Sequence, residues 1–224
     1  MVKIRIDLAN KKNYGGKRGT IKYLVIHYTG NDGDTDEGNA KYFKGQIGTS
    51  AHYFVDDDSV TQSVPDTHVA WSVGGKKYPS CPKSGGGKWY GKCTNNNSIS
   101  VELCDTKRDG RYGFTEKTLE NAAQLCRMLM EKYKIPVENV IRHFDVVGKN
   151  CPAPFVEDEK AWKAFKERLV EDVVKYYEKI GEIPTWAQSM VKDMIAKGCF
   201  ADKDKLHLSD DMLRTMALMQ RYNK

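Results

Sequence analysis

The sequence contains no long apolar run, and this absence limits where the protein can act. No stretch approaches the roughly 20 apolar residues that a membrane-spanning helix needs. The N-terminal stretch Met1–Leu8 alternates apolar and charged side chains, which predicts an edge strand or an extended arm and not the apolar segment of a signal peptide. We therefore expect a protein without a membrane span, made in the cytoplasm without a signal peptide, whose export needs another route.

Cysteine and clustered basic residues are also scarce. Six cysteines in 224 residues are too few for a secreted scaffold built on disulfides. Cys81 and Cys93 bracket a loop rich in glycine and lysine, and the sequence leaves open whether they form a bridge or stay reduced. The net charge of +6 suits an anionic polymer such as a bacterial wall. Acidic residues are interleaved with the basic ones throughout, so we expect no nucleic acid partner.

The zinc motifs H-E-x-x-H and C-x-x-C are absent as well. The chain does contain two histidines and a cysteine near predicted strand ends. His27 follows the apolar run Tyr23–Ile26, and a short turn-forming segment separates His143 from Cys151. Imidazole and thiolate are ligands that zinc prefers, and three protein ligands leave a fourth position for water. The spacing alone leaves open whether these side chains bind zinc or pack without a metal.

Two charged residues accompany this set. Lys149 precedes Cys151 by two residues, where its ammonium could stabilise a thiolate or an oxyanion. Glu102 lies in the alternating segment Ser98–Cys104, which predicts a strand with its polar residues on one face. On an inward face Glu102 would suit a general base, and on an outward face it would be an ordinary surface carboxylate.

The order of the predicted elements indicates the fold class. Apolar runs and alternation predict strands over residues 23–26, 50–56, 60–64, 98–104 and 140–143. Helical periodicity with capping residues predicts helices that begin after Thr35, cover 115–134 and cover about 158–180. We expect an α/β domain over residues 1–180, a central mixed β-sheet flanked by helices. His27 then lies at the carboxyl end of its strand, where open α/β sheets place ligand sites.

Residues 184–224 form a second predicted segment, a small C-terminal helical hairpin. One apolar helix face ends at Gly198, and Ser209 caps the next helix. Two helices of this size cannot hold a hydrophobic core alone, so they must pack on the main domain, on a second copy or on a partner. We expect this tail to bind the cell wall or to form a homo-oligomer.

The region between the second and fourth predicted strands holds candidate ligand-binding residues. Residues 72–97 show no periodicity and are rich in glycine, serine, lysine and asparagine, which is typical of a long functional loop. Trp71 precedes this loop and could stack on a sugar or simply anchor the loop. His68 lies in a turn-like segment and could line a cleft.

Five segments of the chain occur in a recognisable order. They are Leu24–Thr29, Ser50–His52, Val69–Trp71, Asn97–Leu103 and Arg142–Pro152. Together they resemble the N-acetylmuramoyl-L-alanine amidase type 2 family, which includes phage endolysins, bacterial autolysins and peptidoglycan-recognition proteins. The resemblance runs from about Tyr23 to Leu169, and it implies a central mixed sheet flanked by helices with Zn2+ in a surface groove.

This resemblance also implies roles for individual residues. The zinc ligands are expected to be His27, His143 and Cys151. The expected catalytic residues are Glu102, matching an acidic residue of some branches, and Lys149, matching an oxyanion-stabilising lysine. The residues expected to contact substrate are His68, Trp71 and Asn97.

Two positions depart from the family pattern. Some members carry a catalytic tyrosine where this chain has Ala51, and histidine is common where it has Ser72. The first departure places more of the base role on Glu102, and the second leaves His68 or a loop residue to bind substrate. Tyr53 shares the face of Ala51, but we do not expect it to replace the tyrosine.

The activity that the resemblance implies is zinc-dependent hydrolysis of peptidoglycan at the amide bond between the lactyl group of N-acetylmuramic acid and L-alanine. Such an enzyme would be an autolysin or a phage or prophage endolysin, acting on the cell wall after holin-type release through a membrane lesion. Two alternatives stay open. One is a peptidoglycan-binding module without catalysis, and the other is a zinc peptidase that cuts the stem peptide.

Overall fold

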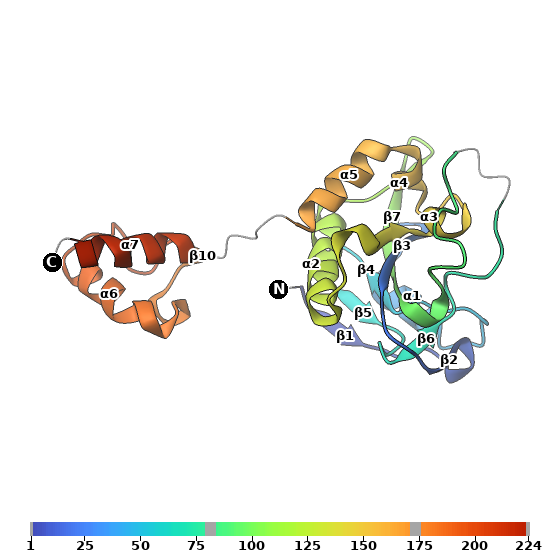
Figure 1. Cartoon of the computed structure of the whole chain (residues 1–224), viewed down its shortest axis with the longest axis horizontal. Coiled ribbons are helices and arrows are strands. Elements are labelled where there is room, and N and C mark those ends of the chain that lie inside the picture. The colour runs from blue at the N-terminus through green and yellow to red at the C-terminus, as the bar shows by residue number, and fades with distance from the viewer. Residues whose placement is uncertain (1, 79–83, 171–175, 223–224) are drawn as a thin grey trace. The chain divides into compact units, whose positions relative to one another are not determined.

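The chain folds into two compact units, which cover residues 1–171 and 172–224. The structure is a computed structural model and describes residues 2–78, 84–170 and 176–222 (Figure 1). Each unit has a hydrophobic core of its own. The division of labour that we expect between a catalytic domain over 1–180 and a tail over 184–224 stays a prediction.

A seven-stranded mixed sheet forms the centre of the first unit. Its strands are β1 (Ile4–Ile6), β3 (Tyr23–Asp32), β4 (Tyr53–Val55), β5 (Val60–Gln62), β7 (Ser98–Arg108), β8 (Arg111–Gly113) and β9 (Val140–Arg142). The order is β1-β5-β4-β7-β3-β9, with β8 paired to β7. β3 runs parallel to both β7 and β9, whereas β4 and β5 run antiparallel to each other. A separate ribbon pairs β2 (Tyr14–Lys17) with β6 (His68–Ala70).

The apolar run of β3 explains its central position. Leu24, Val25 and Ile26 are fully buried, because side chains on both faces of this strand meet the protein interior. A continuous apolar run is the pattern of a strand buried on both faces. The observed strand confirms that prediction and places His27 directly after the run.

Helices cover both faces of the sheet, as the predicted fold class requires. They are α1 (Asp36–Tyr42), α2 (Glu116–Tyr133), α3 (His143–Val147), α4 (Ala153–Glu157) and α5 (Glu159–Arg168), with short 3-10 turns at Lys11–Asn13, Asn95–Asn97 and Val137–Asn139. α2 and α5 share a core with Tyr53 and Val55 of β4, whereas Ala40 of α1 packs against Phe54. Successive side chains of a strand point to opposite faces, so α1 and α2 lie on opposite sides of β4.

The helix predicted over about 158–180 is shorter than expected. α5 ends at Arg168, and residues 171–175 lie outside the described part of the chain. Tyr176–Tyr177 is a strand, β10, paired with β11 (Leu208–Ser209). Tyr177 is buried in the core of the second unit, and this tertiary contact outweighs the helical periodicity of the local sequence.

The second unit contains the predicted helical hairpin. Its helices are α6 (Thr185–Ala196) and α7 (Asp210–Tyr222), preceded by a 3-10 turn at Ile180–Glu182. The buried core consists of Tyr177, Ile183, Ala187, Met190, Val191, Leu206, Leu208 and Leu213. Ser209 accepts a hydrogen bond from the backbone N–H of Met212, which caps α7 as expected. Among the described helices of both units, none has the length and apolar character to cross a membrane.

Candidate metal centre and catalytic cavity

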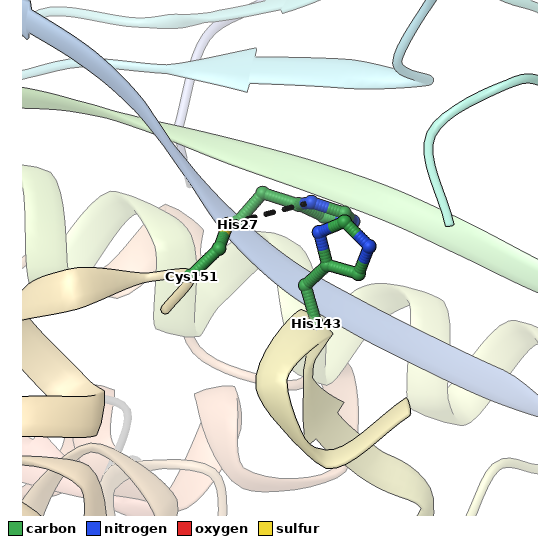
Figure 2. A group of neighbouring side chains, drawn as sticks. All are labelled: His27, His143 and Cys151. Carbon is green, nitrogen blue, oxygen red and sulfur yellow. Dashed lines mark hydrogen bonds between the residues drawn. The ribbon is translucent and has the colours of Figure 1, made fainter. Parts of the chain in front are cut away.

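Two histidines and a cysteine converge at one edge of the central sheet. His27 lies in β3, His143 begins α3, and Cys151 follows the turn after α3 (Figure 2). One possible ligand atom from each residue lies within 4.8 Å of the others. The Sγ of Cys151 is 3.8 Å from Nδ1 of His27, and the two imidazole centroids are 4.5 Å apart. All three side chains are buried.

The sheet register and one turn produce this convergence. Ile26 pairs with Arg142 across the parallel strands β3 and β9, so His27 and His143 leave the sheet side by side. α3 then ends at Gly148, whose φ of 79° is a left-handed conformation that favours glycine. The chain turns back, and the backbone N–H of Phe144 donates to the carbonyl of Cys151 at 2.8 Å.

The donor set fits a zinc ion. His143 donates from Nε2 to the carbonyl of Val73 at 3.0 Å, which leaves its buried Nδ1 without a hydrogen-bond partner. The buried Nε2 of His27 also has no partner. A backbone carbonyl that fixes the tautomer of a histidine is the usual support for a metal ligand. Two imidazoles and one thiol supply three ligands and leave one position open, as in catalytic zinc sites.

Burial keeps the ligands in a suitable protonation state. It lowers the pKa of His143 to about 4 and, together with the charges of His143 and Lys149, lowers the pKa of His27 well below its ordinary value. Both imidazoles are therefore neutral at pH 7, the form that binds metal. Burial and the nearby Glu102 raise the pKa of Cys151, so a cation at this position is what would favour its thiolate.

Glu102 faces the same cluster from β7. It is directly paired with His27 in the register of β3 and β7, and its Oε1 lies 3.7 Å from Nδ1 of His27. Its Oε2 is buried and has no hydrogen-bond partner. Burial raises the pKa of Glu102 to about 8, although the charge of Lys149 acts to lower it. A carboxyl group that exchanges its proton near neutral pH is suited to general acid–base chemistry.

Lys149 and Glu102 line one open cavity of about 620 Å3. The cavity also reaches Tyr28 and Thr29 at the end of β3 and several residues of α1. A volume of this size is in the ordinary range for small-ligand sites. The proposed ligands therefore lie beside a space that can hold a substrate.

The three predicted substrate residues do not line this cavity. His68 lies in β6, where its Nδ1 is 3.1 Å from the hydroxyl of Thr67. Trp71 follows β6 and is 38% exposed. Asn97 accepts from the backbone N–H of Thr94 and donates to a neighbouring carbonyl, so its side chain shapes the loop. Their contact with substrate stays a prediction.

His52 and Arg18 form a buried network that sequence reasoning did not identify. His52 is fully buried, with Nδ1 3.1 Å from the hydroxyl of Ser100 and Nε2 2.8 Å from Arg18. Ser100 and Glu102 share one face of β7, so strand alternation is a signal that could have placed a partner of Ser100 near the site. The contact with Arg18 is tertiary and has no local signal.

Two residues near the expected catalytic tyrosine, Ala51 and Tyr53, have simple structural explanations. Ala51 packs in a small core with Ala40 and Phe54. The hydroxyl of Tyr53 donates to Asp66 at 2.6 Å, so Tyr53 does not act at the cluster. Cys81 lies outside the described residues and Cys93 is buried, so their pairing stays open.

Solved endolysins share this fold. A mutant endolysin from Bacillus subtilis is 27% identical, with a TM-score of 0.60 over 75% of this chain and 99% of that chain. The catalytic domain of XlyA is 28% identical, with a TM-score of 0.59 over 75% of this chain and 99% of that chain. The sheet and its covering helices place the chain in the structural class of these endolysins.

The chain belongs to the N-acetylmuramoyl-L-alanine amidase family, whose model matches residues 17–154. The family interpretation of the sequence is thereby confirmed. The amidase CwlL of Bacillus licheniformis is 32% identical over 180 residues, which are 75% of this chain and 47% of CwlL. The chain spans about half the length of the curated relatives it matches.

Proposed function

We propose that this protein hydrolyses the amide bond between the lactyl group of N-acetylmuramic acid and L-alanine in bacterial peptidoglycan, with zinc as cofactor. The convergence of His27, His143 and Cys151 beside Glu102, at an open cavity, is the observation that carries this proposal. Family membership supports the substrate class. We further propose that the protein is made in the cytoplasm and reaches the wall by holin-type release, as an endolysin or autolysin.

The residues divide the chemistry among them. Zinc in such a site polarises a carbonyl and lowers the pKa of water. Glu102 takes the proton from the attacking water and returns it to the leaving amine, which a carboxyl with a pKa of about 8 can do in both directions. Lys149 faces the same cavity and stabilises the negative charge that develops on the carbonyl oxygen.

Purified sacculi provide the test. The protein should release new amino groups on L-alanine, and mass spectrometry should find intact glycan strands with free lactyl carboxylates. Products cut within the stem peptide would instead identify a peptidase, and binding without products would identify a recognition module. Either result contradicts the proposal.

Substitution of the thiol ligand links activity to the metal. Cys151→Ala should lose most bound zinc together with hydrolysis, because only two protein ligands remain. Cys126→Ala is the matched control, since Cys126 is a buried cysteine of α2 that belongs to the helix core. Full activity of Cys151→Ala would show that the ligand set is wrong.

For the C-terminal unit we propose a binding role, in which residues 184–224 attach the protein to the wall or to a second copy. The exposed apolar side chains of α7 support this role. Removing residues 172–224 leaves every residue of the proposed site in place. The shortened chain should lose affinity for sacculi if the unit binds the wall, and should lose mass per particle if the unit forms oligomers.

A further inference from the structure

The cavity beside Glu102 and Lys149 also contains a carboxylate with no assigned role. Asp34 lies between β3 and α1 and lines the cavity with Asn39. Aromatic rings form much of the remaining wall: Tyr28, Tyr42, Phe43 and Phe54. The cavity therefore combines apolar walls with one negative charge, apart from the proposed catalytic pair.

Among the residues that the structure describes, neutral groups alone form hydrogen bonds with the Asp34 carboxylate. Its Oδ2 accepts from the side-chain amide of Asn39 at 2.6 Å and from that of Asn31 at 3.4 Å, and its Oδ1 lies 3.1 Å from the hydroxyl of Thr29. Within the described ranges, no lysine, arginine or histidine forms an ion pair with it. Neutral donors orient a carboxylate without compensating its charge.

A second carboxylate beside Asp34 increases the local negative charge. Asp105 is 1% exposed, and its Oδ2 accepts from the backbone N–H of Gly30 at 2.7 Å. The hydroxyl of Thr29 lies 3.0 Å from this same oxygen and 3.1 Å from Asp34, yet it has one proton to donate. The Oδ1 of Asp105 is buried without a partner. The two carboxylates thus compete for one hydroxyl proton, and Asp34, which lines the cavity, would gain from a cation there.

We propose that this cavity binds the peptide stem of the substrate and that Asp34 receives the side-chain ammonium of its diamino acid. The identity of the ligand rests on the proposed function. The remaining groups of a stem peptide are amides and carboxylates, so the diamino acid carries the positive charge that matches Asp34. Its methylene groups suit the aromatic walls formed by Tyr42 and Phe43.

This assignment predicts a preference among wall stems. The side-chain amine of the diamino acid is also the group that becomes an amide when two stems are cross-linked. An amide is neutral and cannot form a charge-assisted hydrogen bond with Asp34. Stems with a free amine should therefore bind more tightly than cross-linked stems.

Calorimetric titration of the full chain with a synthetic tripeptide tests the proposal. The probe is L-Ala-γ-D-Glu-L-Lys with its alanine N-terminus acetylated, so that lysine carries its one positive charge, compared with the same peptide acetylated also on its lysine side chain. Neither peptide contains the lactyl amide, so binding is read without hydrolysis. The free-amine peptide should bind about tenfold or more tightly than the acetylated one, as expected for a hydrogen bond between charged groups.

Two variants locate the effect. Asp34→Asn keeps the acceptor for Asn39 but removes the charge, so it should weaken the free-amine peptide about tenfold and leave the acetylated peptide unchanged. Asp32→Asn is the matched control, because Asp32 is exposed, lies outside the cavity lining and accepts only a backbone N–H that asparagine can also accept. Asp32→Asn should keep the wild-type selectivity.

The outcomes separate this proposal from the proposed function. Equal binding of the two peptides by the wild type overturns the ammonium subsite, because the cavity then has no preference for charge. An equal loss of affinity for both peptides in Asp34→Asn also overturns it, because that result indicates a structural role for Asp34. Selective binding without any cleavage of sacculi would leave the subsite standing and would reject the amidase activity. Cleavage of sacculi without selective binding would support the amidase activity and reject the ammonium subsite.

Discussion

The two units of this protein differ in the polar side chains that they bury and in the apolar side chains that they expose. The first unit buries polar and charged side chains, among them His27, His52, Asp105 and His143, while its sheet is covered on both faces. In the described part of the second unit, Ser209 is the only buried polar residue. Large apolar side chains are instead exposed on α7. The first unit therefore encloses ionisable side chains, whereas helix α7 of the second unit presents several apolar side chains to solvent.

The exposed apolar residues of α7 form one stripe. Leu213 faces the core of the second unit, while Met212, Leu218, Met219 and Tyr222 are exposed. Spacings of three, four and seven residues place these four side chains on a common helix face. A stripe of this kind on a small unit is typical of an interaction surface.

The largest expected effect is on turnover, when the buried Glu102 of the first unit is replaced. Glu102→Gln keeps the size of the side chain and removes its ability to exchange a proton, so turnover should fall by about 10²–10⁴-fold. Zinc content, measured by metal analysis, should stay the same because Glu102 is not among the ligands. Glu138→Gln, an exposed glutamate of the same unit, should leave turnover unchanged. A Glu102→Gln variant with wild-type turnover would assign the base role to another residue.

The next largest effect is on the unfolding of the two units, when one buried leucine is removed from the core of each. Leu213→Ala should remove about 2–5 kcal/mol, which is comparable with the whole stability that a unit of this size can reach. Calorimetry should show the unfolding transition of the second unit lost and that of the first unit unchanged. Leu125→Ala, an equally buried leucine of α2, should lower the transition of the first unit without abolishing it. Loss of both transitions in Leu213→Ala would mean that the units fold together.

A smaller effect tests a buried carboxylate outside the site. Burial acts to raise the pKa of Asp66, but hydrogen bonds from Tyr133, Tyr53 and Lys132 outweigh it and hold the pKa below its ordinary value. A lowered folded-state pKa stabilises the fold above the unfolded value of 3.8, and this stabilisation is lost as the pH falls through the folded value. Asp66→Asn should therefore cost about 1–3 kcal/mol at pH 7 and progressively less below pH ~3.8.

Urea unfolding at several pH values measures this difference. The exposed Asp58 provides the control, because Asp58→Asn should change the free energy of unfolding by no more than about 0.5 kcal/mol at any pH. A cost for Asp66→Asn that did not depend on pH would attribute the effect to packing instead of charge.

The smallest effect on stability is expected at the exposed stripe. Met219 is 61% exposed, so Met219→Gln should change the free energy of unfolding by about 0.5 kcal/mol or less. It should nevertheless lower self-association, measured as mass per particle by light scattering, if the stripe pairs two copies. Lys192→Gln, at an exposed position of α6, should change neither quantity. A monomer at all concentrations would favour the wall as the partner of α7.

The cluster of His27, His143 and Cys151 was predictable only in part from the sequence. The apolar run before His27 and the strand before His143 placed both side chains near strand ends, whereas the parallel pairing that brings them together is known only from the structure. The turn-forming segment with Gly148 indicated that the chain could fold back, but the approach of Cys151 to His27 is tertiary, and family resemblance supplied that assignment. Strand alternation placed Glu102 on one face, but only the register with His27 shows which face that is.

The cavity was not predictable at all, because it forms where α1 docks beside the end of β3. Asp34 belongs to a polar loop in the sequence, and nothing local distinguishes it from the neighbouring Asp32. The helix predicted beyond Arg168 was wrong for a related reason, since Tyr177 is buried by a partner strand far along the chain. Local periodicity predicts which residues are apolar, whereas long-range pairing decides what covers them.

The strand order of the sheet has a practical consequence for protein engineering. β7, β3 and β9 are immediate neighbours, and they carry Glu102, carry His27 and lead into His143, respectively. The proposed site is therefore built on three adjacent parallel strands and on the turn that leads to Cys151. The strands β1 and β5 lie at the far edge of the sheet and contribute no side chain to the cluster. Changes at that edge leave the cluster residues in place but disturb α1 and the cavity, because Arg5 of β1 pairs with Glu37 and Thr61 of β5 donates to Asp36.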